Sequence, residues 1–506
     1  MTARATPLLA AAAALLALGS MTSHAQSSTA GTIGEFTARQ DVGHPSHAGS
    51  SSYAEKTGTY TLSGSGANVW AERDAFHFVS RPMKGDFILT ARGHLLGKGV
   101  EAHRKFGWMI RSTLDSSSAH VSAVVHGDGL TSLQFRRTAG AITEEVKSSL
   151  TGADVIQLER RGTTYIMSVA KYGDTLSAVQ TTDIALGDEV NVGLFVCAHN
   201  DSVVERAAIT DVRITRPIRV GFVPYREYIG GRIEIMEVAT GHRRIVYSSP
   251  KALQAPNWTR DGKALIYNQE GRLYRFNLAS GASTEINTAF ATNNNNDHVL
   301  SFDGKQLGIS HSGADNGNKS NVYTVSATGG TPKRITQTGP SYLHGWSPDG
   351  RSLIFTGIRD SATDIYRIPS AGGAEVALTH AAGMNDGSEF ARDGRIYFNS
   401  TRTGLMQLWR MNADGSAPLQ LTSDEYNNWF PHVSPDGRSI VFITFMKDIS
   451  PTDHPWYKPV YLRRMPAAGG KATVLAYLYG GQGTINVPSW SPDGRYVAFV
   501  SNTDKY

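Results

Sequence analysis

The C-terminal half of the sequence is dominated by one recurring motif, Ser-Pro-Asp-Gly or a close variant. Six copies occur, with their aspartates at Asp261, Asp303, Asp349, Asp393, Asp436 and Asp493. An apolar run, such as 353–355 or 440–442, follows each copy, and Asp-Gly between two strands is typical of a tight hairpin turn. Self-similarity with a period of roughly 40 to 50 residues indicates a repeat architecture. The motif therefore predicts stacked, strand-rich units.

A second element, a strand followed by a glycine turn and another strand, alternates with the first. Its six copies begin at positions 233, 273, 322, 365, 408 and 461. The two elements together give four strands per unit, which is the make-up of a β-propeller blade. The repeat region starts with the second element (232–248) and ends with the first (488–501), so one blade should combine both ends and close the ring. We therefore predict a six-bladed propeller over 218–506, with seven blades as the alternative.

The Ser-Pro-Asp-Gly repeats resemble the propeller of TolB-type proteins, the periplasmic component of the Tol system. The resemblance extends over nearly all of 218–506. TolB proteins carry a small α/β domain before the propeller, whereas the preceding region of this chain predicts a β-sandwich. The resemblance thus implies the fold of the second half and an envelope protein, while the first half departs from the pattern.

Residues 53–215 alternate apolar and polar positions in short runs separated by glycine-containing turns, as expected for an antiparallel sandwich. The segments 76–78, 106–111, 134–137, 192–194 and 212–214 resemble those of the concanavalin/laminin-G-like jelly rolls of exported bacterial proteins. The preceding stretch, 26–52, is rich in Ser, Gly, Thr and Ala, and we expect a flexible leader there. The predicted fold class is all-β, a jelly-roll sandwich followed by a propeller.

The N-terminus has the three parts of a secretory signal peptide: a basic residue (Arg4), an apolar run (7–19) and small residues before a cleavage point after Ala25. We expect residues 1–25 to be removed and the mature chain to be periplasmic or secreted. The apolar run is shorter than a membrane span, so the protein is not expected to be membrane-embedded. We expect a monomer.

Composition and motifs exclude several function classes. A single cysteine rules out a disulfide framework and a Cys-rich zinc module. The formal charge of +5 comes with no basic cluster, which disfavours nucleic-acid binding. The sequence also lacks a Gly-x-Ser-x-Gly elbow, a His-Glu-x-x-His motif, a Walker loop and a dinucleotide fingerprint.

Polar residues recur just before the Asp-Gly turns, where the innermost strand of each blade should reach one mouth of the central channel. A second group comes from an insertion in the fifth repeat, 447–459, which should lie on the same face and could stack on a sugar ring. The predicted ligand-binding residues are Asp297, His298, His344, Asp386, His432, Gln482, Asn486, Trp456 and Tyr457.

Three histidines in this set, His298, His344 and His432, are candidate ligands for a divalent metal, manganese, calcium or zinc. The alternatives are hydrogen bonding to a polar ligand and a purely structural role between strands. Oligogalacturonate lyases also resemble TolB propellers and hold a metal in a ring of His and Gln. That resemblance implies a metal-dependent glycan lyase or hydrolase, without assigning a role to any residue here.

Two hypotheses of different classes remain. The first is an exported envelope protein that binds or scaffolds a polysaccharide or protein partner through the propeller mouth. The second is the metal-dependent glycan-active enzyme. An enzyme needs its histidines within a few ångströms of one point, whereas a scaffold tolerates any arrangement.

Overall fold

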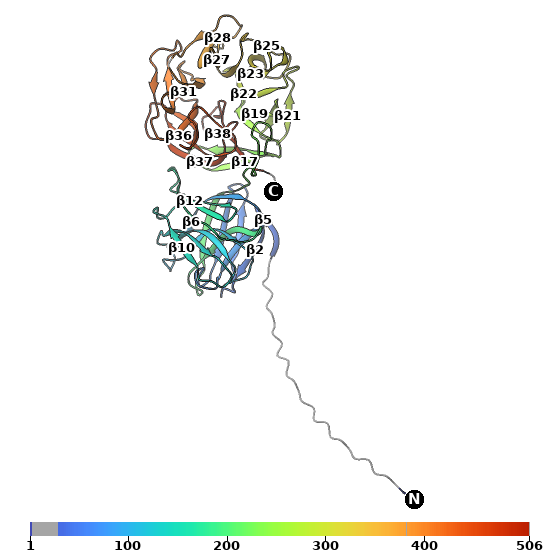
Figure 1. Cartoon of the computed structure of the whole chain (residues 1–506), viewed down its shortest axis with the longest axis vertical. Helices are drawn as coiled ribbons and strands as arrows, with labels where there is room; N and C mark the ends of the chain where they lie inside the picture. Colours follow the sequence, from blue (N-terminus) through green and yellow to red (C-terminus); the bar gives the residue numbers. More distant parts are fainter. Residues whose placement is uncertain (3–28, 381, 505–506) are drawn as a thin grey trace.

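The structure is a computed structural model that describes residues 1–2, 29–380 and 382–504. Most of the predicted signal peptide, including its cleavage point after Ala25, lies outside the described residues. Two all-β domains are stacked end to end, with the propeller above the sandwich in Figure 1. Within the described part, the one helical element is η1(Ala314–Asn316), and no helix there has the length and apolar character needed to cross a membrane.

The N-terminal domain is a sandwich of two antiparallel sheets. The eight-stranded sheet contains, in spatial order, β1(Thr29–Ile33), β2(Phe36–Val42), β5(Phe76–Lys84), β14(Glu189–Cys197), β7(Lys105–Arg111), β8(His120–His126), β9(Thr131–Arg136) and β10(Glu144–Lys147). The seven-stranded sheet contains β13(Ser177–Thr181), β12(Thr164–Ala170), β11(Val155–Arg161), β6(Phe87–Leu96), β15(Glu205–Thr215), β4(Thr59–Gly64) and β3(Ser50–Ala54). Alternating residues from both inner faces, such as Trp108 and Leu158, fill one core between the sheets.

Residues 29–52 differ from the predicted flexible leader. They form β1, β2 and the start of β3, and β2 pairs with β5 while burying Phe36 and Val42. A short strand of this kind gains its hydrogen bonds from the edge of a sheet that the rest of the domain builds. Local Ser- and Gly-rich composition therefore does not reveal it.

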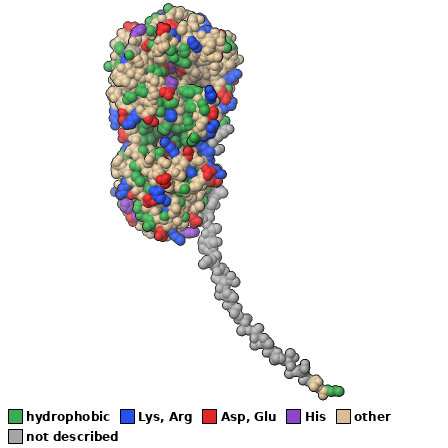
Figure 2. All heavy atoms as spheres, viewed as in Figure 1, with side chains coloured by type: hydrophobic (Ala, Val, Ile, Leu, Met, Phe, Trp, Pro, Cys, Tyr) green, Lys and Arg blue, Asp and Glu red, His purple; other side chains and the backbone are tan. Residues whose placement is uncertain are grey.

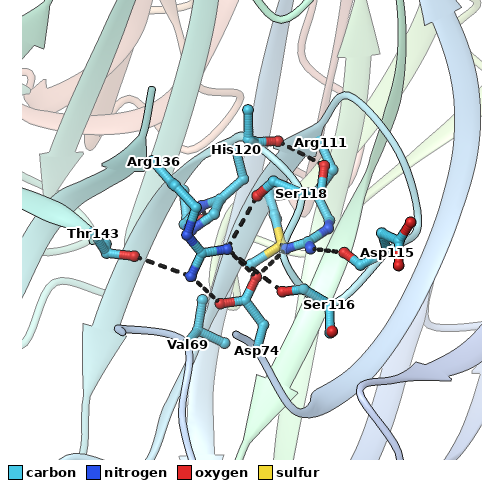
Figure 3. A network of polar contacts seen from close by, with 12 residues as sticks. Val69, Asp74, Arg111, Asp115, Ser116, Ser118, His120, Arg136 and Thr143 are labelled. Atoms are coloured by element: carbon cyan, nitrogen blue, oxygen red, sulfur yellow. Dashed lines mark hydrogen bonds and ion pairs between the residues drawn. The ribbon is translucent and has the colours of Figure 1, made fainter. Parts of the chain in front are cut away.

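A charged network is buried on the outer face of the eight-stranded sheet (Figure 3). Asp74 accepts hydrogen bonds from Arg111 on β7 and from Arg136 on β9, at 2.7 to 2.8 Å. All three side chains are fully buried. Burying two guanidinium groups with a single carboxylate leaves one positive charge in excess. Carbonyl oxygens, including those of Asp115 and Ala71, offset part of the cost because they accept hydrogen bonds from the remaining N–H groups.

The second domain confirms the predicted six-bladed propeller. Five blades are complete four-stranded sheets. From the innermost strand outwards they are β18(Gln254–Trp258), β19(Ala264–Gln269), β20(Arg272–Asn277), β21(Ser283–Ile286) in blade 1; β22(Asn294–Leu300), β23(Gln306–Ser312), β24(Ser320–Ser326), β25(Lys333–Arg334) in blade 2; β26(Ser341–Trp346), β27(Ser352–Arg359), β28(Ala362–Pro369), β29(Val376–Ala377) in blade 3; β30(Asn385–Phe390), β31(Ile396–Thr403), β32(Leu405–Met411), β33(Leu419–Gln420) in blade 4; and β34(Asn427–Val433), β35(Ser439–Phe445), β36(Lys458–Pro466), β37(Thr473–Gly480) in blade 5.

Blade 6 closes the ring with strands from both ends of the domain. The C-terminal strand β38(Tyr496–Asn502) pairs with β16(Gly231–Glu237), the first strand of the domain, and β17(Arg243–Ser249) forms the outer edge. A single bridge between Trp490 and Val497 stands in place of the innermost strand. Pairing of the two ends closes the ring of blades, and the strand edges that remain are those of the outermost strands.

The repeated Asp-Gly motif builds the same turn in each unit. In blade 3, Ser347 donates its hydroxyl proton to Asp349 at 2.6 Å, and Asp349 accepts a second bond from the Arg351 amide at 3.0 Å. The serine oxygen in turn accepts the amide of Ser352, and Gly350 adopts the left-handed conformation with φ 70°. The turn of blade 4 lacks the hydroxyl, because alanine occupies position 391, and Asp393 keeps one bond, from the Arg395 amide.

The two domains meet through the seven-stranded sheet and blades 5 and 6 (Figure 1). Tyrosines from the outer strands of blade 5 cross the junction: Tyr477 donates to the Asp174 carbonyl at 2.6 Å, and the Tyr461 hydroxyl accepts the Leu176 amide at 3.1 Å. At blade 6 the contact is ionic. Arg213 on β15 donates two hydrogen bonds to Glu234 on β16, the shorter of 2.6 Å.

Glu234 is fully buried and joins three segments that are far apart in the chain. Besides Arg213, it accepts the Ser501 hydroxyl of β38 at 2.6 Å, and Arg243 on β17 lies 3.8 Å away. Burial raises the pKa of Glu234, but the two guanidinium groups and the hydrogen bonds outweigh that effect and lower it to about 2. The carboxylate thus holds the sandwich, the first propeller strand and the last one together.

Replacing Glu234 with Gln should lower the free energy of unfolding and should make that free energy less sensitive to low pH. A folded pKa of about 2 against 4.5 gives stability that is present above pH 4.5 and is lost as pH falls through 2, about 3 kcal/mol in all. Urea unfolding of the wild type from pH 7 to pH 2 should show that loss, whereas E234Q should be about 3 kcal/mol less stable at pH 7 and respond less to acid. Glu237→Gln, on the same strand but paired at the surface with Arg495, is the control. An acid response in E234Q equal to that of the wild type would contradict this role.

The turn of blade 3 should contribute more than the turn of blade 4. Asp349→Ala removes acceptors from a hydroxyl and an amide and should cost about 1 to 2 kcal/mol, while Asp393→Ala removes one bond and should cost about half as much. Denaturation midpoints of the two variants measure the difference. Adding the missing hydroxyl with Ala391→Ser should stabilise the protein, and equal losses in the two alanine variants would show that the serine contributes nothing.

Candidate functional site

The innermost strand of each complete blade carries a β-bulge, and the bulges decide which side chains reach the channel mouth. In blade 2 the pairing register shifts between Asn294 and His298, which leaves Asn295, Asn296 and Asp297 unpaired with β23. In blade 3 the extra residue is His344 itself. Bulges of this kind turn side chains away from the sheet, and they are over-represented beside active sites.

These bulged residues line a cavity of about 250 Å³ at one mouth of the channel, here called the mouth cavity. Its walls come from the inner strands of blades 2 to 5, from the loop after blade 5 and from the linker between the domains. The lining residues are Tyr225, Asn295, Asn296, Asp297, Tyr342, His344, Thr356, Ile358, Thr363, Met384, Asp386, Phe430, His454, Gln482 and Asn486.

A buried hydrogen-bond cluster forms one wall of the mouth cavity. Asp386 accepts bonds from Thr356 at 2.6 Å and from the Gly387 amide at 2.7 Å, and its Oδ1 lies 3.1 Å from Nε2 of His344. The insertion places a second histidine beside it, because Nε2 of His454 is 3.8 Å from Oδ2 of Asp386. The inserted loop therefore lies over the same face as His344.

The two carboxyl groups of the mouth cavity differ in acidity. Burial raises the pKa of Asp297 to about 6; His344 opposes this effect, and the nearby Asp386 carboxylate adds to it. Burial also acts on Asp386, but its bond with His344 and the histidine charges lower its pKa to about 2. The pKa of His344 is raised, because its bond to Asp386 and the charges of both aspartates outweigh its burial. At pH 5 one carboxyl is thus protonated beside one that is ionised.

A second cavity, of about 540 Å³, adjoins the first and shares Tyr225, Asn295, Asn296 and Gln482 with it. We call the two together the mouth cleft. Its outer wall is aromatic: Tyr225 and Tyr228 from the linker both meet Trp456 of the insertion edge-to-face, with ring centroids 6.5 and 5.7 Å apart. Tyr225 also donates its hydroxyl proton to Gln482 at 3.2 Å.

The structure brings six of the nine predicted residues to this cleft. Asp297, His344, Asp386, Gln482 and Asn486 line the mouth cavity, and Trp456 lines the adjoining one with Gln482. The other three, His298, His432 and Tyr457, lie elsewhere.

The two misplaced histidines are buried between blades. His298 donates to the Ile266 carbonyl of blade 1 at 3.2 Å, and burial lowers its pKa to about 4. His432 contacts Glu389 and the Ile485 carbonyl, each at 2.5 Å, so both of its ring nitrogens already have a partner within the protein. Only His344 of the predicted metal trio therefore faces the mouth cavity, and the described residues contain no group of three or more His, Cys, Asp or Glu side chains that could hold a metal ion.

Tyr457 belongs to the domain junction instead of the cleft. Its hydroxyl accepts the Ile229 amide at 3.2 Å, and its ring packs edge-to-face on Phe222. Tyr225 and Tyr228, by contrast, were missed as site residues, because the linker belongs to neither domain's pattern. Their only signal in the sequence is three tyrosine and phenylalanine residues in seven, at 222, 225 and 228.

Comparisons with known proteins agree with this architecture. A family model described as the TolB beta propeller domain matches residues 343–453. The uncharacterized protein Atu1656 of Agrobacterium fabrum is 47% identical over 270 residues, which cover 53% of this chain and 91% of that protein. The chain belongs to the TolB-like β-propeller family.

Other members of the TolB-like family extend the comparison. A solved structure, that of putative TolB from Agrobacterium tumefaciens, shares 44% identity, covers 55% of this chain and all of its own, and superimposes with a TM-score of 0.53. The Tol-Pal system protein TolB of Francisella tularensis is 24% identical over 238 residues, so the chain spans about half the length of that relative. Because the match already takes up 91% of Atu1656, that relative has no room for a second domain the size of this sandwich.

Removing the Asp386 carboxylate should change the titration of His344. The hydrogen bond to Asp386 is the largest effect that raises the pKa of His344, and Asp386→Asn removes the charge of that partner. Burial should then dominate, so the pKa of His344 should fall below its ordinary value of 6.5. NMR titration of the histidine ring protons measures it. Asp393→Asn, in an exposed turn, is the control and should leave His344 unchanged. An unaltered His344 titration in D386N would show that the two side chains are not paired in solution.

Proposed function

We propose that this protein is an exported envelope protein that binds an oligosaccharide segment of a polysaccharide in the mouth cleft. The observation that carries the proposal is the meeting of polar side chains from several blades with an aromatic wall supplied by the linker and the insertion. The predicted signal peptide supports export to the periplasm or beyond. The mature chain would then act where envelope polysaccharide is present.

The floor of the cleft offers the groups that sugar hydroxyls need. Asn295 and Gln482 carry both donors and acceptors, and Asp297 and Asp386 add carboxylate oxygens. Much of this set is already fixed in place: Asn295, for example, donates to Asp297 at 2.6 Å and accepts its amide at 3.0 Å. A site fixed before binding loses little entropy when the ligand arrives.

The wall of the cleft offers stacking surfaces for sugar rings. Tyr225 is 57% exposed and Tyr228 is 49% exposed, although both rings contact the buried Trp456. Exposed aromatic rings beside a polar hollow are typical of a binding surface, because they combine apolar area with a polar edge. Over the face seen in Figure 2, acidic and basic side chains are intermixed, so that face carries no large region of a single charge sign.

One observation favours a second function, hydrolysis of the bound glycan. Two carboxyl groups with pKa values pushed apart, about 6 for Asp297 and about 2 for Asp386, are the arrangement that glycan-cleaving enzymes use as acid and base. The test is product analysis on the glycan that binds. In this case Asp297→Asn should abolish cleavage and retain binding.

Tyr225→Ala tests the main proposal. On a glycan array the mature wild-type protein should select a defined oligosaccharide, and Y225A should bind it about tenfold more weakly, because the stacking surface is lost. Tyr225→Phe keeps the ring, loses the bond to Gln482, and should bind nearly as well as the wild type. Phe290→Ala, at an exposed aromatic residue outside the cleft, is the control.

Two results would overturn the proposal. The first is an array without any selected glycan while an envelope protein is captured through the same face. The second is a selected glycan whose binding is indifferent to Y225A and unaffected by Gln482→Ala. Since Tyr225 is exposed, its replacement should leave the thermal unfolding midpoint close to that of the wild type.

A further inference from the structure

The sandwich contains a cavity of its own, remote from the propeller mouth in sequence and topology. It has a volume of about 270 Å³ and lies on the outer face of the eight-stranded sheet, beside the network of Figure 3. It is lined by Asn68, Trp70, His103, Lys105, His126, Leu130, Gln134, Glu145, Lys147 and His199. Four neighbouring strands, β7 to β10, and the loop between β4 and β5 therefore contribute to one hollow.

Lys105 is the unusual residue of this cavity. It is 2% exposed, and its amine donates to the neutral Asn68 Oδ1 at 3.1 Å. Lys105 forms no ion pair among the described residues, although the Glu145 side chain lines the same cavity and its charge acts to raise the pKa of the amine. Burial lowers the pKa of Lys105. An anion placed beside the amine would favour its charged form and offset that effect.

In the neighbouring network of Figure 3, the buried cations on the same strands do have a carboxylate partner. Arg111, six residues along β7 and on the same face as Lys105, has the Asp74 carboxylate at 2.7 Å (Figure 3). Lys105 has an amide oxygen and an open hollow instead. A buried cation without an ion-pair partner costs stability, and strongly perturbed charged groups of this kind cluster at functional sites.

Gln134 is a second residue of this cavity with an unpaired polar atom. This side chain is 1% exposed; its Nε2 donates to Glu145 at 3.1 Å, while its Oε1 is buried without a hydrogen-bond partner in the described part of the chain. A buried acceptor left unpaired lowers the stability of the folded protein. A hydroxyl donor on a ligand in the cavity would satisfy it.

The cavity is also lined by three histidine rings and Trp70, together with Leu130, Glu145 and Lys147. His103 meets His126 and His199 edge-to-face, with centroids 5.7 and 5.4 Å apart. Burial lowers the pKa of His126 to about 4, so this ring is neutral at pH 7. Trp70, which is 37% exposed, also lines the cavity, and an exposed indole can stack on a ring-shaped ligand.

We propose that this cavity binds a sugar ring that carries a carboxylate, a uronic acid residue, with Lys105 on the carboxylate, Gln134 Oε1 accepting from a hydroxyl, and Trp70 stacked on the ring. The volume suits one monosaccharide unit. Inorganic phosphate would satisfy Lys105 but would leave Trp70 without a partner. A neutral sugar would satisfy Gln134 and Trp70 but leave the amine uncompensated. The inference does not depend on what the mouth cleft binds.

The test uses the whole mature protein and two probes that differ in one group, the methyl glycosides of glucuronic acid and of glucose. Isothermal titration should detect the acid and give at least tenfold weaker binding for the neutral glycoside. Lys105→Met, which keeps the stem and removes the amine, should weaken binding of the acid at least tenfold and make the two probes equivalent. Inorganic phosphate, titrated at the same concentration, should compete poorly.

Controls separate loss of the site from loss of the fold. K105M should unfold at the same temperature as the wild type or higher, since it removes an uncompensated buried cation. Trp70→Ala, at an exposed position, should weaken both probes alike. Lys84→Met, at an exposed lysine paired with Glu189, should change neither. Equal affinity for the two glycosides in the wild type, tighter binding of phosphate than of the uronate, or full uronate binding by K105M would each overturn the proposal.

Discussion

A single buried carboxylate, that of Glu234, joins the parts of this molecule that the chain itself leaves far apart. It binds the last sandwich strand through Arg213 and the last propeller strand through Ser501, while lying on the first propeller strand. A propeller closes only if its two end strands pair in the correct register, because a slip of one residue would turn every side chain of the strand to the other face. A fully buried ion with partners on both sides allows one register only, because any other would leave charges unpaired.

The architecture of the propeller could be predicted because its information is local and repeated. The Asp-Gly turn is made by residues within five positions of each other, such as Ser347, Asp349 and Ser352. Each copy of the motif therefore contains all the residues that determine its turn. Residues 29–52 are the opposite case. Their strands exist because β5 offers an edge to β2, and nothing in their own composition encodes that edge.

The candidate site was predictable in outline and not in detail, and the bulges are the physical reason. His298 and His344 stand at the same distance before their Asp-Gly turns, yet one donates to a neighbouring blade and the other faces the cavity. The extra residues of the bulge fall before His298 in blade 2 and on His344 in blade 3, which changes the side of the strand that each residue faces. The spacing of residues in the sequence does not reveal where the bulge falls within the strand. It likewise does not indicate that Tyr225 of the linker lies at the site.

The closure in blade 6 also bears on how such proteins are assembled from parts over evolution. Because the propeller begins and ends on adjacent strands, β16 and β38, the whole ring is attached to the rest of the chain at one place. A gene fusion can therefore exchange the neighbouring domain without opening the ring or renumbering its blades. What such an exchange does alter is the linker, and here the linker brings Tyr225 into the mouth cleft. A change of partner domain would thus alter the aromatic wall of the mouth cleft and would also remove Arg213, the sandwich partner of Glu234.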